Sequence, residues 1–116
     1  MNRGTITGGV VTQAASAYTA PTFAAPSVRR VVFKIATRDS RGGSAFWNCE
    51  AESPAQLLDF LETRAEPGQG IKVEYELAAR PFYKRGVLAG EARFLRVLAA
   101  EIEGVRVPAV REAVPA

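Results

Sequence analysis

Aromatic side chains stand next to clusters of basic residues at two places in the chain. Phe46-Trp47 follows a basic segment at 38–41. Phe82-Tyr83 lies between Arg80 and Lys84-Arg85. Flat rings stack on exposed nucleobases and cations neutralise phosphates, so this pairing is typical of surfaces that hold unpaired nucleic acid strands. Neither contact needs the edge of a base, and we therefore expect binding without sequence preference.

Each predicted contact has a simpler alternative. A lone tryptophan in a small domain usually belongs to the core, and cations on strands are usually solvated. Adjacent side chains on a strand point to opposite faces, so one of Phe46 and Trp47 faces outward, and we favour Trp47. The predicted aromatic contacts are Trp47, Phe82 and Tyr83, and the predicted phosphate contacts are Lys34, Arg29, Arg38, Arg41, Arg80, Lys84, Arg85 and Arg96.

The composition argues against most catalytic and metal sites. The chain has no histidine and a single cysteine, Cys49. This excludes histidine-based triads, cysteine-based metal sites and an intrachain disulfide. We predict no catalytic residue, metal or cofactor, and Cys49 is expected to be a small, partly buried filler. An enzyme would depend on carboxylates such as Glu50 or Glu91, and this is the least favoured alternative.

Charge is unevenly distributed along the chain, although the net charge is only +3. Residues 28–47 and 80–96 each carry five basic side chains and one acidic side chain. Residues 50–66 carry five acidic side chains and only Arg64 of the opposite sign. Such a molecule would steer a polyanion to one side. The N-terminus has no long apolar run, so we expect neither a signal peptide nor a membrane span, and the cytoplasm is the default compartment.

One short helix is well marked between Ser53 and Gly68. Ser53 and Gln56 have the spacing of a capping box, and Pro54 suits the first helical position. An apolar stripe of leucines follows, and Pro67-Gly68 ends the helix.

Strand-like segments flank this helix on both sides. Three come before it and two after it, which is the order of the OB-fold, an all-β five-stranded barrel with a helix between the third and fourth strands. The predicted strands are 4–13, 28–37, 45–52, 70–82 and 92–102, with Gly8-Gly9 as a bulge in the first. We expect loops at 14–27, 38–44 and 83–90, one domain over 1–103, and an irregular tail over 104–116 because of its prolines.

Short motifs in the expected order resemble the bacterial and phage single-stranded DNA-binding protein (SSB) family. They are MNRGTITG (1–8), FKIAT (33–37), FWNC (46–49), SPAQLL (53–58), GIKVEYEL (70–77) and the last strand, 92–102. The resemblance implies that Trp47 is the stacking tryptophan of the third strand and that Phe82 lies near the stacking aromatic at the end of the fourth. It also implies a homodimer or homotetramer, with 3–11 as a candidate interface.

The chain departs from this family in several places. Asn48 stands where the family has histidine, and Leu77 stands where it has glycine. The chain shows no long linker with an acidic, Phe-tipped tail, so we do not expect partner recruitment by that route. A divergent member that coats single-stranded DNA during replication, repair or recombination fits best. The alternative is an OB-fold protein-interaction module, similar to primosome accessory proteins, with weak nucleic acid binding.

Overall fold

The protein is a β-barrel with one helix. The computed structural model describes residues 2–20, 28–38 and 40–109. Its elements, in chain order, are β1 (Arg3–Ala20), β2 (Val28–Arg38), β3 (Ser44–Ala51), α1 (Ala55–Arg64), β4 (Gly70–Lys84), β5 (Val87–Ile102) and β6 (Val105–Pro108). The predicted order of five strands with a helix after the third is confirmed.

The sheet closes on itself through one parallel pairing. The strands follow the order β3-β2-β1-β4-β5-β6, and β3 also pairs with β5. In this parallel contact Cys49 lies opposite Leu95, whereas the other pairings are antiparallel. Closure removes the free edges of the five barrel strands. The fold is the OB-fold expected from the element order.

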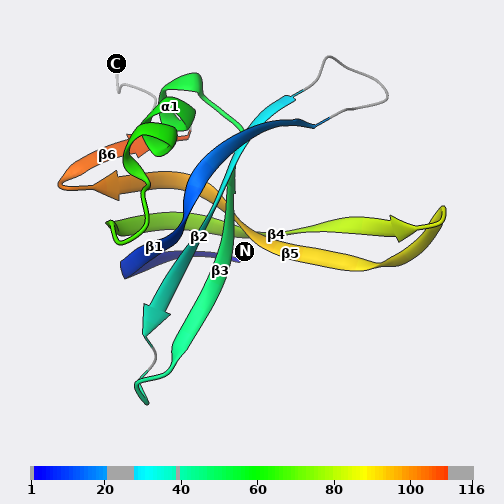
Figure 1. Ribbon diagram of the computed structural model, residues 1–116, viewed down its shortest axis with the longest axis horizontal. Helices are drawn as coiled ribbons and strands as arrows, with labels where there is room; N and C mark the ends of the chain where they lie inside the picture. Colours follow the sequence, from blue (N-terminus) through cyan, green and yellow to red (C-terminus); the bar gives the residue numbers. More distant parts are fainter. Residues whose placement is uncertain (1, 21–27, 39, 110–116) are drawn as a thin grey trace.

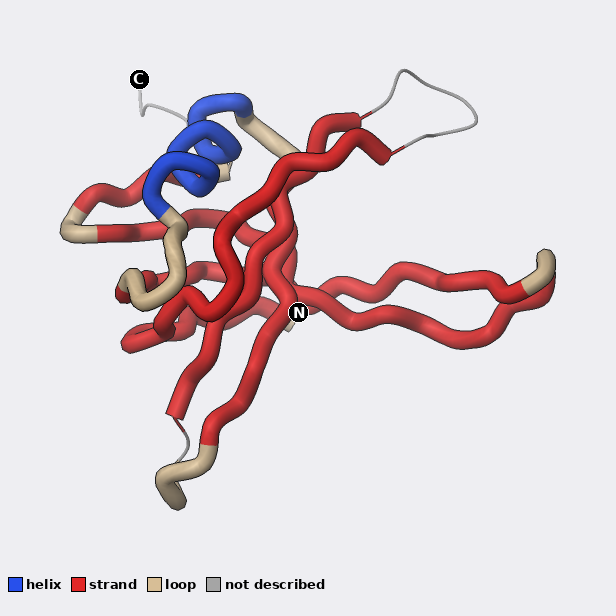
Figure 2. Tube along the Cα trace, in the orientation of Figure 1, coloured by secondary structure: helices blue, strands red, loops and turns tan. Residues whose placement is uncertain are grey.

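Alternating side chains build the core. Phe33 and Ile35 on β2 and Val73 on β4 are buried, while the residues between them face outward or are partly exposed. Leucines 57, 58 and 61 of α1 pack into the same cluster. Figure 2 shows the helix on one side of the barrel, away from the ends of the β2–β3 and β4–β5 hairpins.

Several local predictions were wrong. Strand β1 continues to Ala20, so the predicted loop is shorter; residues 21–27 lie outside the described part of the chain. The predicted hairpin loop at 83–90 is only a turn at Arg85-Gly86, because β4 and β5 stay paired up to Lys84 and Val87.

The expected tail and helix cap also differ from the structure. Residues Val105–Pro108 form β6 along the end of β5, and Val107 is buried. Proline is tolerated there because it ends the strand. Pro54, not Ser53, is the N-cap of α1, and no side chain caps the helix. The predicted bulge is confirmed: the β1–β4 register shifts between Ile6 and Gly9, and Gly8 has φ of 71°.

Two hairpins extend beyond the barrel. Figure 1 shows the β2–β3 hairpin and the β4–β5 hairpin leaving the barrel in different directions. These are the two segments in which the sequence concentrates its basic residues. Most of the predicted contact residues therefore lie on hairpins that project beyond the packed core of the barrel.

Candidate nucleic-acid interface

A groove of about 570 Å³ lies where the two hairpins leave the barrel. Strands β3, β4 and β5 form it, and Asn2 lies at its border. Its lining residues are Asn2, Phe46, Trp47, Asn48, Leu77, Ala78, Ala79, Glu91, Arg93, Phe94 and Leu95. Most of the lining residues are apolar or aromatic, polar groups form about as much of the surface as apolar ones, and one arginine and one glutamate face the groove from β5.

Trp47, a predicted stacking residue, lines this groove. Its side chain remains 36% exposed, and its Nε1–H donates a hydrogen bond of 3.1 Å to the Thr37 hydroxyl on β2. Phe46 was expected to face the opposite way, yet it is 68% exposed and lines the same groove. Both rings are accessible because this part of β3 belongs to the projecting hairpin, where neither face of the strand is covered by core.

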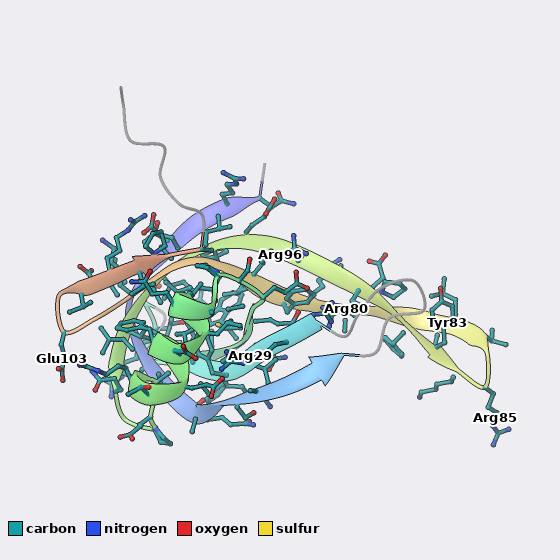
Figure 3. All side chains as sticks on the ribbon, turned by 90° about the horizontal axis from the view of Figure 1, so that it is seen from above. Arg29, Arg80, Tyr83, Arg85, Arg96 and Glu103 are labelled. Carbon is teal, nitrogen blue, oxygen red and sulfur yellow. The ribbon has the colours of Figure 1, made fainter. Side chains whose placement is uncertain are left out.

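Phe82 and Tyr83 lie farther out on β4. Both are exposed, and neither lines the groove itself. The Phe82 ring packs over Gly90 on β5, where a Cβ atom would be 3.2 Å from the ring. Figure 3 shows Tyr83 on the outer part of the hairpin, beyond Arg80. The barrel-side parts of β4 and β5 line the groove, and the two rings lie farther along the same hairpin. They therefore extend the aromatic surface outward from the groove.

Of the residues that line the groove, only Trp47 was a predicted contact. Phe94 and Arg93 on β5 also line the groove, and Arg93 pairs across the strands with Ala79. The inward face of β5 was not clear from the sequence, because Phe94, Leu95, Val97 and Leu98 do not alternate strictly. Arg93 stands directly before Phe94, so a basic and an aromatic residue are neighbours here as they are near Phe46-Trp47 and Phe82-Tyr83. This pattern in the sequence could have identified both residues as candidate contacts.

Arg80 is engaged by a buried carboxylate. Its guanidinium makes two hydrogen bonds to Glu50, of 2.6 and 3.3 Å, and Glu50 is only 7% exposed. The Arg80 Cζ atom also lies 4.9 Å from the centre of the Phe94 ring, a cation–π distance. The three side chains form a unit at the base of the β4–β5 hairpin. The predicted contact of Arg80 with phosphate stays a prediction.

Arg29 lies beside the helix and not beside the groove. It donates to Asp59 at 3.1 Å and makes a second short hydrogen bond to Glu62, both on α1 (Figure 3). These hydrogen bonds raise the pKa of the Arg29 guanidinium. Arg29 therefore links β2 to the acidic helix.

The other predicted cations lie on or near the hairpins. Arg38 is at the exposed end of β2, and Arg41 is in the β2–β3 turn. Lys84 and Arg85 are at the tip of the β4–β5 hairpin, where Figure 3 shows Arg85 pointing away from the barrel. Arg96 lies 3.9 Å from Glu76, and Lys34 lines a second hollow.

Cys49 is buried on β3 and borders the second hollow. Burial raises the pKa of its thiol to about 12, so it stays protonated at neutral pH. Among the residues that the structure describes, no three His, Cys, Asp or Glu side chains are placed to hold a metal ion. No helix in the described part of the chain is long and apolar enough to cross a membrane.

Comparisons with known proteins give structural matches only. No family model and no curated protein sequence matches the chain. Its structure is similar to the mitochondrial single-stranded DNA binding protein Rim1 of S. cerevisiae, with a TM-score of 0.65 and 18% identity over 88% of this chain and 94% of that one. A Plasmodium falciparum SSB, solved in complex with ssDNA, matches with a TM-score of 0.64 and 12% identity over 84% of this chain and 86% of that one. At these identities the similarity shows that the OB-fold is shared.

Proposed function

We propose that this protein binds single-stranded DNA without sequence specificity and does not transform it. The observation that carries the proposal is the open groove, in which Phe46, Trp47 and Phe94 are accessible together and Arg93 lies among them. Accessible rings, with the cations of the two hairpins nearby, are what a flexible strand with exposed bases needs. Two of the similar structures are single-stranded DNA-binding proteins by name, which supports the same use of the fold here.

Binding would proceed in two physical steps. The cations of the hairpins attract the phosphate backbone over a range set by salt, and the bases then stack on the groove rings. In this scheme Trp47 and Phe94 stack first, and Phe82 and Tyr83 extend the track. The proposed phosphate contacts are Lys34, Arg38, Arg41, Lys84, Arg85, Arg93 and Arg96. Arg29 and Arg80 have carboxylate partners and are proposed to be mainly structural.

Trp47 reports on this proposal directly, because it is the only tryptophan. Adding a dT oligomer at low salt should quench its fluorescence, and higher salt should reverse the quenching. Trp47→Ala should weaken binding of a labelled oligomer about 5- to 150-fold, since one stacked base contributes about 1–3 kcal/mol. Val105→Ala, an exposed change on β6, is the control and should bind like the original protein. Absence of quenching at low salt would contradict the proposal.

We also propose that the chain is a divergent SSB-family member that acts as a homo-oligomer, with roles in replication, repair or recombination. The order of its motifs and the shared fold support membership of the SSB family. The resemblance to the SSB family supports a homo-oligomer, with residues 3–11 on β1 as the candidate interface. Light scattering with and without a dT oligomer tests the assembly. The proposed compartment is the cytoplasm, where a free buried thiol such as Cys49 is usual.

A further inference from the structure

A second, smaller hollow adjoins the groove. It has a volume of about 200 Å³ and shares Asn48 and Phe94 with the groove. Its polar lining comes from β1, β2 and β3, with Gln13 and Lys34 as the further exposed side chains. A strand lying in the groove can therefore continue over Asn48 into this hollow without leaving the surface of the barrel.

The polar side chains of the hollow form a row across three strands. Gln13 lies opposite Lys34 in the β1–β2 pairing, and Lys34 lies opposite Asn48 in the β2–β3 pairing. All three are exposed, whereas the next residues along β2 and β3, Phe33 and Cys49, are buried. The β1–β2 register shifts on both sides of Gln13, and such bulges re-aim a side chain. The row therefore faces the solvent side of the barrel.

The aromatic wall of the hollow is held in place by Arg80. Arg80 lies over the Phe94 ring at 4.9 Å and is itself anchored by two hydrogen bonds to the buried Glu50. This arrangement restricts the motion of the ring before any ligand arrives, which lowers the cost of ordering it on binding. The carboxylate of Glu50, which also lines the hollow, is thereby committed to Arg80.

The remaining polar groups favour one kind of base edge. The Lys34 ammonium is a donor only, whereas the amides of Gln13 and Asn48 can each donate or accept, so Lys34 gives the row its excess of donors. Such a row suits a base that presents a carbonyl oxygen, such as O4 of thymine or uracil. Cytosine presents an amino group at the same position. A hollow this small suits a single ring, which can stack on Phe94.

We propose that this hollow is a base subsite with a preference for keto bases over amino bases. The proposal rests on the proposed binding of single-stranded DNA and adds a modest selectivity to one position of an otherwise non-specific track. Its hydrogen-bonding residues are Lys34, Asn48 and Gln13, with Lys34 now assigned to the base in place of a phosphate, and Phe94 is its stacking residue.

Oligomers of dU and dC of equal length test the subsite, because both are pyrimidines and differ at the amino or carbonyl group. The original protein should bind dU about fivefold more tightly than dC, the effect of about one net hydrogen bond. Lys34→Met should bring the ratio close to one, whereas Asn48→Ala should weaken the binding of both oligomers. Lys72→Met, on β4 outside both hollows, removes the same charge as Lys34→Met and should leave the ratio unchanged.

The outcomes separate the subsite from the function. Equal binding of dU and dC by the original protein, or an equal loss for both in Lys34→Met, would overturn the subsite while leaving DNA binding in place. Binding of neither oligomer would contradict the proposed function itself, and the subsite with it.

Discussion

Two arginines near the groove carry the same charge but have different contacts. Arg80 and Arg93 are both cations on the β4–β5 hairpin, yet Arg80 is held by Glu50 and Phe94, while Arg93 lines the groove. A carboxylate that is 7% exposed needs a partner, because an uncompensated buried charge costs several kcal/mol. Arg80 is therefore expected to act on binding through the position of Phe94 and not through phosphate.

The salt dependence of binding distinguishes these two roles. Arg93→Met should lower the slope of log affinity against log salt by about 0.7, the value for one lost phosphate contact on a single strand. The double variant Glu50→Gln/Arg80→Gln should weaken binding severalfold with the slope unchanged, because Phe94 loses its support. The double variant is used because Arg80→Gln alone would remove the guanidinium that compensates the buried Glu50 carboxylate. An equal decrease of slope in both variants would show that Arg80 contacts phosphate.

At the scale of elements, the outer part of the β4–β5 hairpin contributes no residue to the core of the barrel. Beyond Pro81 and Glu91, the residues of the β4–β5 hairpin are exposed or only partly buried, and none belongs to the core cluster. The hairpin nevertheless carries Phe82, Tyr83, Lys84 and Arg85. Its sequence is thus expected to serve binding more than stability.

Shortening this hairpin tests whether its outer part serves binding and not stability. Residues 82–90 can be replaced by Asn-Gly, which forms a two-residue turn between the paired residues Pro81 and Glu91. We expect the midpoint of thermal unfolding to change by only a few degrees, while affinity for a dT oligomer falls at least about fivefold, the effect of losing one weak base stack.

Phe82→Ala/Tyr83→Ala in the full-length hairpin is the companion variant, since it removes the rings and keeps the charges. Trp47 remains in both proteins as the fluorescent reporter. Unchanged affinity in the shortened protein would show that the outer hairpin takes no part in binding.

At the scale of the whole molecule, one ion pair links the last strand to the barrel. Arg106 on β6 donates to Glu74 on β4 at 2.8 and 3.4 Å, reaching across β5. This hydrogen bonding lowers the pKa of the Glu74 carboxyl in the folded state. The folded protein therefore binds this proton less readily than the unfolded chain does. The stabilisation is complete above the ordinary pKa of Glu and disappears as the pH falls through the lowered value.

Urea unfolding at several pH values measures this contribution. At pH 7, Glu74→Gln should be less stable than the original protein by less than about 1 kcal/mol, because the pair is largely exposed to solvent. The difference should shrink as the pH falls below the ordinary pKa of Glu. Glu66→Gln, an exposed carboxylate after α1, removes the same charge without the ion pair and is the control. A difference between Glu74→Gln and the original protein that does not shrink on acidification would rule out the ion pair as its cause.

Local patterns are enough to predict the order of the elements and the types of residue at the candidate interface. Alternation in residues 70–77 and the apolar stripe at 57–61 identify strand and helix, because each period matches one local backbone geometry. The three-dimensional fold is needed to show which cations are paired and which rings share one groove. Glu50 hydrogen-bonds with Arg80, and Phe94 and Trp47 line the same groove, from strands distant in sequence. Such meetings depend on strand register and barrel closure, which local patterns do not contain.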